Sequence, residues 1–175
     1  MRSGLGDDAE ALALLDRQQQ LLQPLGASAP KSLLLDSAAL RGYSLRMLGR
    51  ESECLSALQP MLTVAKAAAD AAPLPAAEFL SQLGRCHALL GAAPQARELF
   101  SQALQLRHVH ADAGALIAES ETDLARLRPA DKRLGALRNA LANLRAAVSF
   151  SRTAGLSIIA RNLGGSTPQR AYRSA

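Results

Sequence analysis

The feature that most constrains this chain is a sequence repeat with a period of about 42 residues. Shifting the chain against itself by one period brings identical residues together in four pairs: Gly42 and Gly84, Leu48 and Leu90, Gly49 and Gly91, and Leu62 and Leu104. A shift shorter by one position continues the series through Ala77 and Ala118, Leu83 and Leu124, and Arg85 and Arg126. We therefore expect three successive units, preceded by a half-unit. Repeats of this length cannot bury their apolar faces alone and stack on their neighbours.

The composition favours stacked helices over sheets. Apolar residues make up 49 % of the chain, whereas aromatic residues make up only 3 % and tryptophan is absent. No segment alternates convincingly with period two. Helical spacing and breaker residues instead predict helices at 8–22, 31–48, 52–70, 75–90, 93–108, 112–127 and 133–153. The expected fold class is all-α.

Glycine and proline residues mark where the predicted helices turn. Gly49 and Gly91 supply turn residues inside two units, and Pro24 with Gly26 closes the first helix. Pro60 instead lies in the middle of a predicted helix, where it removes a backbone donor and costs about 3 kcal/mol unless the helix kinks or splits. We therefore expect a break in that helix at Pro60.

Residues 77–107 carry small and large apolar residues in the order that an antiparallel helix pair needs. They resemble a tetratricopeptide repeat at the family's Leu-Gly pair, turn glycine, aromatic and small packing positions: Leu83, Gly84, Gly91, Phe100, Ala96 and Ala103. The longer period resembles the subclass found in kinesin light chains and in bacterial signalling proteins. The resemblance implies a right-handed α-solenoid of antiparallel helix pairs over residues 1–153, followed by a capping segment and basic tail at 154–175. Its parts are a half-unit at 8–30 and units at about 31–72, 73–111 and 112–153.

The resemblance also implies a function, because first helices of tetratricopeptide repeats line a concave groove that binds proteins or peptides. It predicts a non-catalytic interaction module in a bacterial regulatory or signalling setting, and the half-unit at the start fits a fragment of a larger protein. Carried over by position, the groove candidates are Asp36, Tyr43, Arg46, Glu78, Ser81, Gln82, Arg85, Glu119, Thr122, Asp123 and Arg126. The alternative is that these charges pair between neighbouring units and only help them to stack, contributing under about 1 kcal/mol each if exposed.

The charge of the chain is divided between two regions. Residues 1–125 contain ten Lys and Arg against fourteen Asp and Glu, a balance of −4, whereas residues 126–175 contain ten against one, a balance of +9. A basic segment of this kind attracts nucleic acid or an anionic surface. The alternative function is therefore binding of such a surface through the arginines at 126, 128, 133, 138, 145, 152 and 161.

The residue pattern gives no reason to expect catalysis, a cofactor or a metal. His108, His110 and Asp112 have side chains that suit metal ions, but no further ligand is placed beside them. The isolated glycines lack the sequence of a phosphate-binding loop. We therefore expect neither an enzyme nor a metal or cofactor site.

The two cysteines are expected to lie unpaired in the core. Cys54 and Cys86 are too few for a disulfide framework and lack the spacing of zinc ligands, which favours a reducing, cytoplasmic setting. The first ten residues contain three acids and no apolar run of signal-peptide length, and no later run is long enough to cross a membrane. The chain is therefore expected to be unprocessed and not inserted in a membrane.

Overall fold

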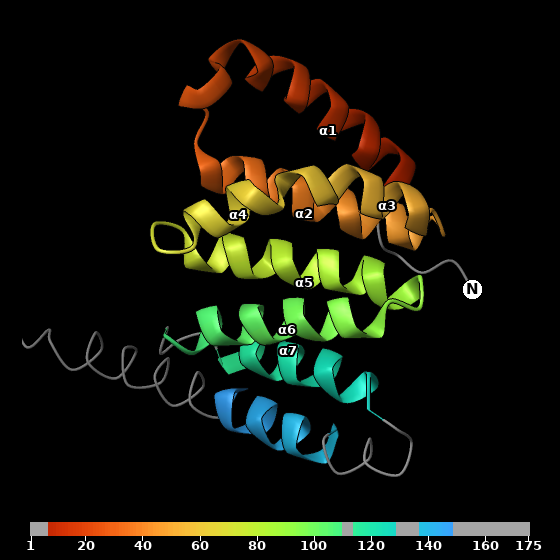
Figure 1. Ribbon diagram of the computed structural model, residues 1–175, viewed down its shortest axis with the longest axis vertical. Coiled ribbons are helices and arrows are strands. Elements are labelled where there is room, and N and C mark those ends of the chain that lie inside the picture. The colour runs from red at the N-terminus through yellow and green to blue at the C-terminus, as the bar shows by residue number, and fades with distance from the viewer. Residues whose placement is uncertain (1–6, 110–113, 129–136, 149–175) are drawn as a thin grey trace, which may run out of the picture.

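The computed structural model describes residues 7–109, 114–128 and 137–148, and within these ranges every regular element is a helix (Figure 1). The elements are α1 (Asp8–Leu22), η1 (Gln23–Ser28), α2 (Lys31–Met47), α3 (Glu51–Leu58), η2 (Gln59–Met61), α4 (Leu62–Ala68), α5 (Pro73–Leu89), α6 (Ala93–His108) and α7 (Gly114–Arg126). A further helix covers residues 137–148 and is called helix 137–148 below. The all-α prediction is confirmed for the described part of the chain.

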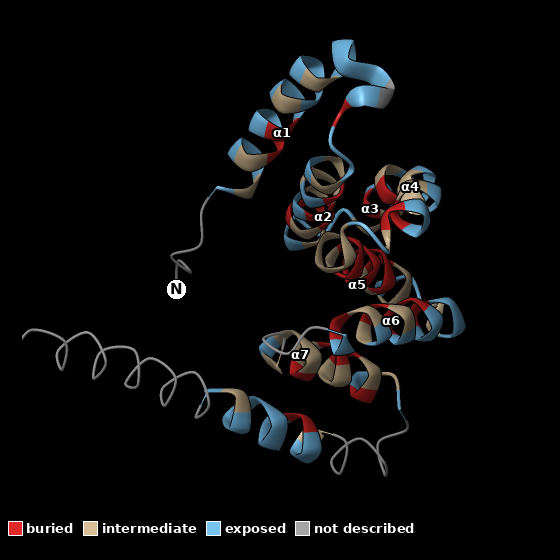
Figure 2. Cartoon of the chain, turned by 90° about the vertical axis from the view of Figure 1, so that its left-hand side faces the viewer, coloured by how far each residue is buried: buried red, intermediate tan, exposed pale blue. Residues whose placement is uncertain are grey.

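Helices that follow one another along the chain also pack on one another. α1 packs on α2, α2 on α3 and α4, α5 on α6, and α6 on α7. We call α2 with the broken helix α3–α4 the first helix pair, and α5 with α6 the second. Contacts of α2 with α5 join these first two helix pairs. Turning the molecule by 90° places α3, α4 and α6 on one side and α2 and α7 on the other (Figure 2). Helix 137–148 lies beside α7 in both views and donates a hydrogen bond of 2.6 Å from Asn143 to Glu121.

The predicted turns and the predicted break are confirmed. Gly26, Gly49 and Gly91 have positive φ angles of 48°, 70° and 78°, a conformation that glycine adopts without a steric penalty. Pro60 lies in the short 3-10 helix η2, which separates α3 from α4. The missing backbone donor of Pro60 is therefore placed at the start of a new turn and not inside a continuous α-helix.

The repeat is visible in the packing of two glycines against bulky side chains. A Cβ atom added at Gly84 would lie 2.6 Å from Cε1 of Phe100, and one added at Gly42 would lie 2.7 Å from Cδ2 of Leu58. Gly42 and Gly84 are one repeat period apart, and so are Leu58 and Phe100. The two units thus share one way of bringing their paired helices close together.

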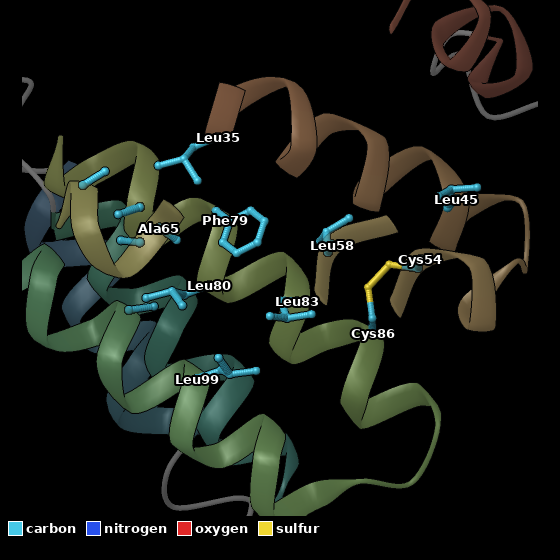
Figure 3. Packing of buried hydrophobic residues seen from close by; sticks show 14 of the residues in the cluster. Leu35, Leu45, Cys54, Leu58, Ala65, Phe79, Leu80, Leu83, Cys86 and Leu99 are labelled. Carbon is cyan, nitrogen blue, oxygen red and sulfur yellow. A yellow bond between two sulfur atoms is a disulfide. The ribbon is translucent and has the colours of Figure 1, made fainter. Parts of the chain in front are cut away.

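A continuous apolar cluster joins α2, α3 and α4 to α5 and α6. It includes the fully buried side chains of Leu35, Leu58, Phe79 and Leu83, and Leu99 lies at its edge (Figure 3). Burial of a large apolar side chain stabilises a fold by about 1.5 to 3 kcal/mol. These contacts hold the first two helix pairs together.

The two cysteines form a disulfide, so the prediction that they are unpaired was wrong. Cys54 of α3 and Cys86 of α5 are bonded across the cluster, with their Cα atoms 6.0 Å apart (Figure 3). Both residues are fully buried, as expected. The number of cysteines alone did not reveal that packing of α3 on α5 brings this pair together. Because the cysteines are bonded, they no longer support the prediction of a reducing compartment.

Several predictions concern residues outside the described ranges. They include the capping segment and tail at 154–175 and two members of the His-Asp group, His110 and Asp112. Among the helices of the described ranges, none has the length and apolar character needed to cross a membrane.

Candidate partner-binding site

A groove of about 580 Å³ brings together six of the eleven predicted site residues. These six are Arg46 of α2, Arg85 of α5, and Glu119, Thr122, Asp123 and Arg126 of α7. Leucines complete the walls: Leu89 at the end of α5, Leu127, and Leu137, Leu141 and Leu144 of helix 137–148. The groove therefore combines charged residues with an apolar wall that the groove prediction did not include.

Arg85 joins α5 to α7 inside this groove. Its Nη2 atom lies 2.6 Å from Oδ2 of Asp123 and 2.6 Å from Oε1 of Glu119, and its Nε atom donates to the same Asp123 oxygen at 2.8 Å. Burial alone would lower the pKa of Arg85, but the hydrogen bonds and charges of the two carboxylates raise it above its usual value. Arg85 therefore remains charged and connects two neighbouring units, and it makes no ion pair with Glu78 of its own helix.

Asp123 is buried, although the sequence predicts it to face an open groove. Its side chain is only 3 % exposed, and its second oxygen lies 3.4 Å from Nη1 of Arg126, which is largely exposed. Buried carboxylates require charged or hydrogen-bonding partners. Arg85 meets this requirement, and Arg126 extends from the same carboxylate into the groove.

Arg107 is the most important polar residue that the site prediction missed. This α6 side chain is fully buried and donates to Oε2 of Glu78 at 2.6 Å, Oγ of Ser120 at 2.6 Å and the carbonyl oxygen of Leu116 at 3.0 Å. It also lies 3.6 Å from a carboxylate oxygen of Glu119. Arg107 therefore links α6 with α5 and α7.

One signal in the sequence could have identified Arg107. A shift by one repeat period places it on Ala65, which is also fully buried. An arginine at a position that packs a small apolar side chain in the preceding unit needs an anionic partner beside it. Glu78 is that partner.

Arg46 is the groove cation whose charge is least compensated. It donates to Oε1 of Gln82 at 2.6 Å and lies over the ring of Tyr43, 5.8 Å from its centre. Its Nε atom is buried without a hydrogen-bond partner, and the described residues supply no carboxylate that pairs with it. Burial, and after it the charge of Arg85, lowers the pKa of Arg46. Arg46 is therefore available to an anionic group of a ligand.

The remaining predicted residues have separate places. Gln82 is buried and donates to Oε1 of Glu78 at 2.7 Å, so these two residues continue the polar contacts from Arg46 towards Arg107. Asp36 is exposed on α2, and Ser81 is fully buried with its hydroxyl oxygen unpartnered among the described residues. Neither Asp36 nor Ser81 lines the groove.

Comparisons with known proteins add no family to this geometry. No protein-family model matches the chain, and no similar protein was found among curated proteins or solved structures. Within the described ranges, no group of three His, Cys, Asp or Glu side chains is arranged to hold a metal ion.

Proposed function

We propose that this chain is a non-catalytic protein–protein interaction module, built as a right-handed solenoid of long tetratricopeptide-like repeats. The groove defined above is its binding surface for a helical or extended segment of a partner protein. Six of the eleven residues expected on such a surface line this one groove, which is the observation that carries the proposal.

The chemistry of the groove favours an amphipathic ligand. Leu141 and Leu144 line it while remaining 46 % and 38 % exposed, so a ligand can cover apolar surface that water now contacts. Covering such surface contributes about 25 cal/mol per Å². Arg46 and Arg126 add positive charge beside this apolar wall, which suits a ligand with leucine-like and acidic side chains.

A selection experiment with displayed peptides tests this proposal. Peptides enriched on the wild-type chain should lose at least about tenfold in affinity for Leu141→Ser/Leu144→Ser, since the lost apolar contacts are together worth more than about 1.4 kcal/mol. Val109→Ser is the matched control, because Val109 is 74 % exposed and does not line the groove. Equal affinity of the groove variant and the wild type would reject the groove as the binding surface.

The exposed arginines of the C-terminal region favour a second candidate function. Arg126, Arg128, Arg138 and Arg145 are all exposed on α7, directly after it, or on helix 137–148. If they bind the phosphates of nucleic acid, affinity for generic DNA or RNA should fall steeply as salt rises from low to physiological concentration. A lack of retention on nucleic acid at low salt would exclude this function.

A further inference from the structure

The outer face of α1 presents exposed leucines that no described residue covers. Leu14 and Leu21 are 61 % and 72 % exposed and lie seven residues apart, nearly two helical turns, so they point in the same direction. Asp7 and Glu10 are exposed on this side, nearer the start of the helix, and Arg17 lies between the leucines. We call these five residues the outer face of α1.

Helix 137–148 presents a leucine stripe with the same spacing. Leu141 and Val148 are also seven residues apart and are 46 % and 51 % exposed, and Leu144 lies between them. Leu141 and Leu144 form part of the groove wall. The leucine stripe is thus an apolar surface beside the groove cations.

The charges of the two surfaces are opposite. The outer face of α1 carries two acids, Asp7 and Glu10, and one arginine, Arg17. Helix 137–148 contains two arginines and no acid, and Arg126 of the groove is 68 % exposed at its side chain. Opposite charges around an apolar contact steer association and fix its register.

From these matched surfaces we propose that the groove binds α1 of a second copy of this chain, an inference that rests on the proposed function. Leu14 and Leu21 of one copy pack between Leu141, Leu144 and Val148 of the next. Leu14 and Leu21 are about 10.5 Å apart along the axis of α1, and Leu141 and Val148 are separated by the same distance along their helix. Because the spacings match, the apolar side chains of the two helices interdigitate. Glu10 and the start of α1 face the arginines of the groove and of helix 137–148.

This contact is heterologous, because each copy contributes a different surface. When the groove of one copy holds α1 of a second copy, the groove of the second copy remains open, and a third copy can add there in the same way. Heterologous contacts that do not close into a ring produce open chains of subunits. The wild-type protein should therefore form oligomers whose size grows with concentration.

A mixing experiment with two variants tests the arrangement. Leu14→Ser/Leu21→Ser removes one surface and Leu141→Ser/Leu144→Ser removes the other, and light scattering after size-exclusion chromatography measures the mass of each species. The wild type should form dimers and larger species, whereas each variant alone should be monomeric. An equal mixture of the two variants should form a dimer and nothing larger, because only one intact pair of surfaces remains.

Circular dichroism and thermal melting of each variant verify the fold. A second test keeps the leucines and reverses the charge of one residue on each surface. Glu10→Arg and Arg138→Glu should each shift the wild-type oligomers towards monomer, and higher salt should do the same. Mixing the two charge variants should restore part of the association. A monomeric wild type at every concentration, or a mixture of the leucine variants without a dimer, would overturn the inference.

The two proposals can fail separately. A groove-selected peptide that binds the wild type while the wild type stays monomeric rejects the second copy as the occupant but retains the groove. Oligomers that persist in both leucine variants reject this contact, whatever the peptide result. If both proposals are correct, the selected peptide should dissociate the wild-type oligomers.

Discussion

The same repeat builds two junctions of different chemistry in this molecule. The first junction, of α2, α3 and α4 with α5, contains the apolar cluster and the Cys54–Cys86 disulfide. The second junction, of α5 and α6 with α7, contains the ion pairs of Arg85 and Arg107. Apolar contacts tolerate small shifts, whereas a buried ion pair stabilises only when its atoms meet in one geometry. We therefore expect the first junction to provide most of the stability and the second to fix how α7 is oriented.

The largest expected effect comes from removing the disulfide of the first junction. Cys54 and Cys86 are 32 residues apart, and closure of such a loop lowers the entropy of the unfolded chain by an amount worth about 3 to 4 kcal/mol. Reduction should lower the free energy of unfolding by up to this amount, measured by chemical denaturation with and without a reductant. The control is Cys54→Ala/Cys86→Ala, which should show no response to reductant. Equal stability of the oxidised and reduced wild type would contradict the role given to the bond.

The next largest effect is expected at the centre of the second junction. Arg107→Met removes a fully buried cation, and Oε2 of Glu78 and Oγ of Ser120 lose the hydrogen bonds that it donates, which should reduce the free energy of unfolding by about 3 kcal/mol. Glu78 is partly exposed, so water can solvate it and keep the loss near this value. Denaturant unfolding monitored by circular dichroism measures the change.

Arg97→Ala is the matched control for this variant. Arg97 lies on the same helix but is exposed, and its hydrogen bond to the carbonyl oxygen of Leu127 is 3.3 Å long. The control should lose under about 1 kcal/mol. Similar losses in the two variants would show that the buried position of Arg107 has no special importance.

A smaller effect should distinguish the two equivalent glycines. Gly84→Ala gains helix propensity of about 1 kcal/mol but places a methyl group against the buried ring of Phe100, where overpacking costs about 1 to 3 kcal/mol. Gly42→Ala meets the terminal methyl groups of Leu58, which can move by rotation of the side chain. Thermal melting should show Gly84→Ala to be the less stable of the two. The reverse order would contradict this account of close packing in the two units.

The smallest effect concerns the pH dependence of the first junction. Burial lowers the pKa of His87, whose Nε2 atom lies 3.3 Å from Oε1 of Gln59. As the pH falls through about 6.5, the unfolded chain takes up a proton before the folded chain does, so stability decreases until the folded pKa is reached. His87→Gln should reduce this decrease in melting curves recorded between neutral and mildly acidic pH. An unchanged pH dependence would show that His87 does not contribute.

The sequence predicted local features of the fold well, but it did not predict contacts between helices that are distant in the chain. The bounds of α1 and α6 coincide with the predicted helices 8–22 and 93–108, because capping, periodicity and breakers are local properties. Arg107 and the disulfide were missed because both depend on the register between helices that are distant in the sequence. One local period does not determine which polar or sulfur atoms meet across a junction.

The candidate site was predictable to a similar extent. Arg46, Arg85 and Asp123 are among the positions that the tetratricopeptide resemblance proposed, and they line one groove. Ser81 is buried outside the groove. Side chains that differ by a fraction of a helical turn point to different faces, so a small error in the assumed rotation of α5 places a packing residue on the groove face. The leucines of helix 137–148 were not predicted, since the tetratricopeptide resemblance assigned the groove to the first helix of each unit alone.

The disulfide also alters what a break in the backbone would do. The turn at residues 69–72, between α4 and α5, lies inside the ring that Cys54 and Cys86 close. If a protease cuts the chain there, the two fragments stay covalently attached and migrate as one species until the bond is reduced. Covalent continuity across the first two helix pairs is therefore maintained by the sulfur atoms as well as by the peptide backbone.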